Sequence, residues 1–96
     1  MATKTKFDQT IEQQLSKLNN AQREVAQAQF SIYKKNRSRI SDIDTELEAI
    51  RATSAQTMDA FKYKQTKITT LAYERGQLAM ANSKIAADLF DFLEDK

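Results

Sequence analysis

Large apolar side chains recur at steps of three, four or seven residues through the last third of the chain. The recurring positions are Phe61, Ile68, Leu71, Leu78, Ile85, Leu89 and Phe92. This spacing places them on one face of an α-helix, in the heptad pattern of helices that pack against one another. Arg75 and Asn82 fall on the same face. The pattern predicts a long helix whose contact surface, here called the C-terminal seam, needs a partner helix.

The composition favours helix throughout. The 96 residues include no proline and one glycine, Gly76, so little in the sequence makes turns or sheet. The length allows one domain at most. We therefore predict an all-α fold in a single helical domain over residues 1–96.

Gly76 allows a close helix crossing or a bend beside the small Ala72 and Ala79, or is a tolerated exposed glycine; the sequence leaves both interpretations open.

A second seam runs through the N-terminal half, with amide side chains at alternate positions. Its apolar members are Ile11, Leu15, Leu18, Val25 and Ile32, and its amides are Gln22, Gln29 and Asn36. A buried amide weakens a helix pair but fixes its register. A narrow, solvent-exposed contact between two helices, in which glutamine is not selected against, explains the pattern equally well.

The segment 51–57 contains no large apolar side chain and includes Thr53-x-x-Gln56, a spacing typical of a helix capping box. We expect the chain to reverse here and to form a long antiparallel hairpin of two helices, with helix one over about 7–50, a turn at about 51–54 and helix two over about 54–93. Thr45-x-x-Glu48 is an alternative cap. An unbroken helix is the other interpretation, because no further glycine or proline lies nearby.

Two helices alone would cover only one side of several large residues, among them Tyr33, Ile40 and Met80. Each large apolar group left in water forfeits about 1.5–3 kcal/mol. We therefore expect oligomerisation or a partner helix to complete the hairpin.

The formal net charge of +2 is small, but the charges occur in blocks. In a hairpin we expect one basic patch with interleaved aromatic side chains, made of Tyr33, Lys34, Lys35, Arg37, Arg39, Lys62, Lys64 and Lys67. An acidic protein partner fits such a patch. Nucleic acid is the alternative ligand, because lysine and arginine neutralise phosphates, although the neighbouring acidic block would repel them.

Little in the sequence supports catalysis or metal binding. The chain lacks cysteine and histidine, which removes thiol chemistry and the usual zinc ligands. Ser31-x-x-Lys34 and Tyr63-x-x-x-Lys67 match spacings found in some enzymes, but helices produce such pairs routinely and a glycine-poor helical chain offers no walled pocket. We predict no enzymatic activity, no cofactor and no metal site.

Phe90-x-x-x-Glu94 near the C-terminus is similar to the aromatic-x-x-x-acidic export tail of the ESAT-6/WXG100 family. These small helical hairpins of type VII secretion are about as long as this chain. The resemblance implies that Phe90 and Glu94 are recognition residues. The chain departs from the family pattern in having no tryptophan and hence no Trp-x-Gly turn.

These features together predict a non-enzymatic protein-interaction module, such as an adaptor, chaperone or assembly factor, that lays its seam against another helix. A secretion-targeting hairpin and a nucleic-acid-associated protein are the alternatives. No apolar run approaches the ~20 residues that span a bilayer, so we expect no membrane partner. The compartment stays open between cytoplasm, secretion without a cleaved signal peptide, and a virion.

Overall fold

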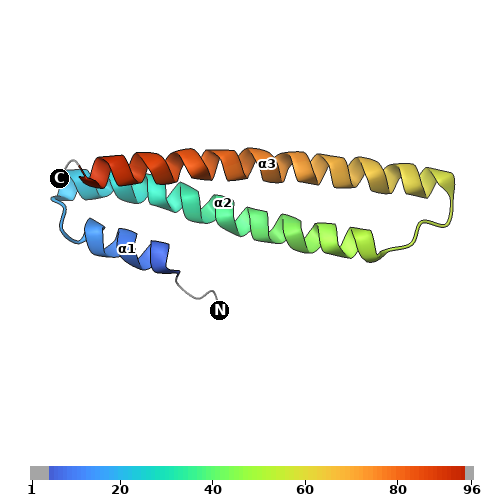
Figure 1. Ribbon diagram of the computed structural model, residues 1–96, viewed down its shortest axis with the longest axis horizontal. Coiled ribbons are helices and arrows are strands. Elements are labelled where there is room, and N and C mark those ends of the chain that lie inside the picture. The colour runs from blue at the N-terminus through green and yellow to red at the C-terminus, as the bar shows by residue number, and fades with distance from the viewer. Residues whose placement is uncertain (1–4, 95–96) are drawn as a thin grey trace.

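The computed structural model describes residues 5–94 and contains three helices in this range: α1 (Lys6–Leu15), α2 (Asn20–Ala52) and α3 (Met58–Glu94). Helices α2 and α3 run antiparallel along a rod 60 Å long, and α1 lies beside the end at which α2 begins (Figure 1). The all-α prediction is confirmed. The two-helix hairpin is corrected to three helices, because the predicted helix over 7–50 is divided after Leu15.

A capping box causes this division. The Asn19 side chain accepts a hydrogen bond from the Gln22 backbone at 2.8 Å, and the Gln22 side chain accepts one from the Asn19 backbone at 3.3 Å. The Arg23 guanidinium donates to the carbonyls of Leu15 and Leu18, at 3.1 and 2.9 Å. The Leu15 carbonyl belongs to the last turn of α1 and the Leu18 carbonyl to the connection, so Arg23 stabilises the end of α1 while Asn19 starts α2.

The second connection, residues 53–57, also differs from the prediction. Thr53 ends α2 rather than capping the next helix, and its hydroxyl donates to the Ala49 carbonyl at 3.0 Å. Thr57 caps α3, because its hydroxyl accepts a hydrogen bond from the Ala60 backbone at 3.1 Å. The predicted Thr53-x-x-Gln56 box is therefore wrong, and α3 begins at Met58 instead of near residue 54.

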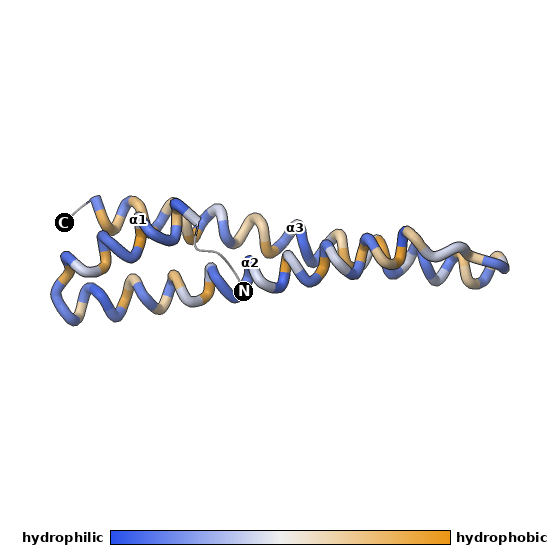
Figure 2. Tube along the Cα trace, turned by 90° about the horizontal axis from the view of Figure 1, so that it is seen from below, coloured by the Kyte–Doolittle hydropathy of each residue, from blue (hydrophilic) through white to orange (hydrophobic). Residues whose placement is uncertain are grey.

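Two apolar cores lie along the rod, and apolar positions recur along each helix between hydrophilic ones (Figure 2). The first core joins all three helices and has as its buried members Ile11, Leu15, Leu18, Ala26, Phe30, Leu89 and Leu93. The second joins only α2 and α3 and is made of Ile43, Leu47 and Leu71, with Ile50, Ile68 and Leu78 packed against it. The rod is thus a three-helix bundle at one end and a helix pair at the other.

Polar contacts between α2 and α3 separate the two cores. The Asn36 amide donates to the Asn82 side-chain oxygen at 3.0 Å, and the Asn82 amide donates to the Tyr33 carbonyl at 3.1 Å. Arg39 binds Glu74 through two hydrogen bonds, of 2.7 and 2.9 Å. These pairs join specific positions on the two helices, so they fix how one slides along the other.

Candidate functional site

The C-terminal seam packs mostly inside the chain. Leu71 and Leu89 are buried in the second and first core, respectively. Ile68 and Leu78 pack against the second core, and Ile85 and Phe92 pack against the first. Phe61 differs, with 48% of its surface exposed. The partner helices of this seam are therefore α2 and α1, and a surface for another protein has to be sought elsewhere.

The α2 members of the predicted basic patch are largely occupied. The Arg37 guanidinium holds Asp8 through two hydrogen bonds, of 2.8 and 2.9 Å. These bonds favour the carboxylate more than burial disfavours it, so they lower the pKa of Asp8, a side chain that is 4% exposed. Tyr33 packs against Phe7, and the Lys34 ammonium lies 4.7 Å from the centre of the Phe30 ring.

Lys35 is exposed, whereas Arg39 is bound to Glu74 and lowers the pKa of that carboxyl through their hydrogen bonds. Arg39 lies thirteen residues before the end of α2, and therefore about 20 Å along the rod from it. Lys64 lies at that end, where its ammonium donates to the Thr53 carbonyl at 2.6 Å. In the predicted basic patch, Arg37 and Arg39 are thus bound to carboxylates, whereas Lys62, Lys64 and Lys67 lie nearer the reversal.

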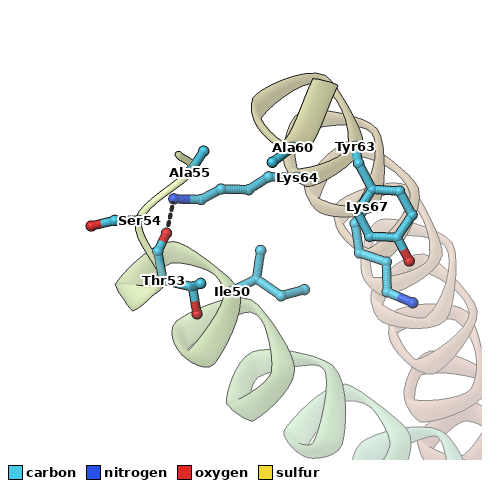
Figure 3. A pocket seen from close by; sticks show the side chains of 8 residues that line it. All are labelled: Ile50, Thr53, Ser54, Ala55, Ala60, Tyr63, Lys64 and Lys67. Atoms are coloured by element: carbon cyan, nitrogen blue, oxygen red, sulfur yellow. Dashed lines mark hydrogen bonds between the residues drawn. The ribbon is translucent and has the colours of Figure 1, made fainter. Parts of the chain in front are cut away.

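The α3 members stand at the hairpin tip, here residues 50–67, beside a pocket of about 370 Å³. This tip pocket is lined by Ile50, Thr53, Ser54, Ala55, Ala60, Tyr63, Lys64 and Lys67. Figure 3 shows the Lys64 stem crossing from α3 to the Thr53 carbonyl, with Ile50 below it. Tyr63 and Lys67 stand side by side on α3 at its other edge (Figure 3). The walls are mainly carbon, so the pocket suits an apolar side chain.

Three large apolar residues of the tip are left uncovered, and one of them, Tyr63, lines the pocket. Tyr63 is 70% exposed and Met58 66%, and Phe61 is also exposed, as noted above. The charged residues of the tip are Arg51, Lys62, Lys64 and Lys67 against Asp59 alone. The tip therefore combines an apolar cavity with a cationic surrounding, which is the chemistry expected for an acidic amphipathic ligand.

Phe90 and Glu94 are both exposed at the opposite end of α3. The Phe90 ring meets the Phe7 ring edge-on, with centroids 5.5 Å apart, so this aromatic residue also helps to hold α1. The role in export that the ESAT-6/WXG100 resemblance implies for this pair stays a prediction.

Within residues 5–94, no group of three or more acidic side chains is arranged to hold a metal ion. No helix in the same range has an apolar stretch long enough to cross a bilayer.

No protein-family model, curated protein or solved structure matches the chain.

The sequence analysis includes Lys64 and Lys67 in the basic patch but does not predict a pocket at the tip. The available signal was the run of small residues over 52–55 between Ile50 and Tyr63. Small side chains beside two large apolar ones leave space at a reversal. This signal predicts a pocket only when the position of the reversal is already known.

Proposed function

We propose that the chain is a non-enzymatic protein-interaction module, of the adaptor, chaperone or assembly-factor type, and that the tip pocket is its docking site. The observation that supports this is the carbon-lined pocket with Tyr63 exposed at its edge, while Met58 and Phe61 are exposed elsewhere on the tip. Uncovered apolar surface of this kind on a small protein typically marks a binding site. An apolar side chain of the partner fills the pocket.

The charges of the tip favour an acidic partner segment. Lys62 and Lys67 are exposed beside the pocket, and Lys64 is held in place by the Thr53 carbonyl. Exposed ion pairs contribute only about 0.2–1 kcal/mol each, so they select the partner and speed its approach. The affinity comes mainly from the apolar side chain that enters the pocket, at about 1.5–3 kcal/mol for a leucine or phenylalanine.

Two pools of synthetic helical peptides test this function. Each peptide spans about four helical turns and carries leucine or phenylalanine anchors, flanked by glutamate in one pool and by lysine in the other. We expect the glutamate pool to shift the backbone amide NMR signals of residues 53–55 and 60–67. The lysine pool should leave them in place.

Two variants locate the binding. Tyr63→Ala should weaken binding of the glutamate pool about tenfold, because it removes one wall of the pocket. Val25→Ala is the control, since Val25 is 57% exposed and lies near the start of α2, away from the tip. Equal binding of both pools, or equal effects of both variants, would contradict the proposal. Binding of single-stranded DNA at the same amides, with no peptide binding, would favour the nucleic-acid alternative.

A further inference from the structure

A second heptad pattern runs along α3 on the side away from α2. Its positions follow steps of three and four residues, and every one is exposed and uncharged: Thr66, Thr69, Tyr73, Gly76, Met80, Ser83, Ala87 and Phe90. We call this set the outer face of α3. Helix α3 is thus patterned for helix contact on two sides, whereas the described helices cover mainly one, with α1 reaching the outer face at Phe90 through Phe7.

Size alternates along the outer face. Tyr73 and Met80 stand seven residues apart and are 70% and 68% exposed, and small residues at 69, 76 and 83 lie between and beyond them. Projecting side chains next to small ones form the knobs and holes of a helix interface. Exposure of Tyr73 and Met80 is unfavourable unless another surface covers them.

Gly76 supports the same conclusion. A glycine inside a helix costs about 1 kcal/mol relative to alanine. No atom of this chain lies within 4 Å of the place where a Cβ on Gly76 would stand, so packing within the described chain does not require a glycine. A glycine on an exposed contact face lets a second helix approach closely, as the sequence interpretation of a close crossing suggested.

The charges of α3 indicate which helix approaches. Its first part carries Lys62, Lys64 and Lys67 against Asp59, a net charge of +2. Its last part carries Asp88, Asp91 and Glu94 against Lys84, which is paired with Asp88, a net charge of −2. A second α3 laid antiparallel places the basic part of each copy against the acidic part of the other. A parallel arrangement would bring like charges together.

Two residue pairs on α3 lie symmetrically about the centre of the helix. Helix α3 spans 58–94, so its midpoint is Gly76. Tyr73 and Met80 lie symmetrically about the point between residues 76 and 77, and so do Lys62 and Asp91. A two-fold axis at this point places Tyr73 of one copy opposite Met80 of the other, and Lys62 opposite Asp91.

We propose that the chain forms an antiparallel two-fold dimer through the outer face of α3, with the helices crossing at Gly76. The occupant of this face is a second copy, because the charges along α3 are complementary to those of an antiparallel copy. The outer face includes none of the residues that line the tip pocket, and the dimer places the two tips at opposite ends.

Sedimentation equilibrium over a range of concentrations tests the proposal with the full chain. Tyr73→Glu combined with Met80→Glu should raise the dimer Kd at least 100-fold, because four charges would enter an apolar contact. Gly76→Leu should raise the Kd at least tenfold while increasing thermal stability of the monomer, since leucine favours helix and meets open space in the isolated chain. Ser38→Leu, an exposed change on α2, is the control and should leave the Kd unchanged.

Orientation is tested by charge exchange and by labelling. Lys62→Glu and Asp91→Lys should each weaken the dimer about threefold to tenfold, and the double exchange should restore it. Ser54→Cys provides a single site for a spin label, since the described chain contains no other cysteine. The distance between the two labels of a dimer should be long, because the antiparallel arrangement places the two tips at opposite ends. A chain that stays monomeric at millimolar concentration overturns the proposal. A dimer Kd that is unchanged by the substitutions at residues 73, 76 and 80 also overturns it. So does a short distance between the two spin labels.

Discussion

At the scale of single residues, Asn82 makes the contacts that specify how α2 and α3 are aligned. It is 8% exposed and joins Asn36 to the Tyr33 carbonyl. Asn82→Ala should lower the free energy of unfolding by about 1–3 kcal/mol, because it removes the acceptor of the part-buried Asn36 amide and a second hydrogen bond to the Tyr33 carbonyl. Urea unfolding followed by circular dichroism measures this loss. Replacing Asn36 and Asn82 together by leucine should recover much of it, and purely additive losses would show that the two amides are not coupled.

The Asp8–Arg37 pair should make stability depend on acid pH. Because the folded-state pKa of Asp8 lies below its ordinary value of 3.8, its contribution is complete above that value. The contribution is lost as the pH falls through the lowered folded-state pKa. Unfolding at pH 7 and at pH 2 should therefore differ less in Asp8→Asn than in the unchanged chain. An identical pH dependence in both proteins would exclude Asp8 as a source of the acid sensitivity.

At the scale of helices, the junction between α1 and α2 depends on one capping side chain. Asn19→Ala should cost about 1 kcal/mol, because the Gln22 backbone loses its acceptor. Asn20→Ala is the matched control, since Asn20 is the exposed first residue of α2, and it should cost far less. Hydrogen exchange should also show faster opening of α1 in Asn19→Ala. Equal effects of the two substitutions would mean that the cap does not define the junction.

Periodicity predicted the helical class and the C-terminal seam because both depend on local spacing. It missed the break after Leu15 because Leu18, although it lies in the connection, is buried and continues the apolar spacing. The Asn19-x-x-Gln22 spacing was the signal that could have revealed it. The basic patch was misjudged because Asp8 and Glu74 bind Arg37 and Arg39 across 29 and 35 residues of sequence. Local patterns do not show which distant carboxylate neutralises an arginine.

At the scale of the whole molecule, the proposed dimer has a distinctive shape. The two-fold point coincides with the middle of α3, so two rods overlap along their full length. Small-angle scattering should therefore give twice the chain mass with a maximum dimension still near 60 Å, the length of one rod. Tyr73→Glu with Met80→Glu should halve the mass and change that length little. A dimer much longer than one rod would require end-to-end contact instead.

The reversal at residues 53–57 is built without any left-handed backbone, since none of the described residues has a positive φ. No position in it therefore demands glycine, and most side chains can occupy it without strain. The two cores lie along the helices and draw only Ile50 and Ile68 from near the tip. Residues at the hairpin tip, the proposed docking site, can thus be substituted without disturbing the packing of the helices. Such substitutions would change which partner binds. Such a scaffold lets recognition evolve separately from folding.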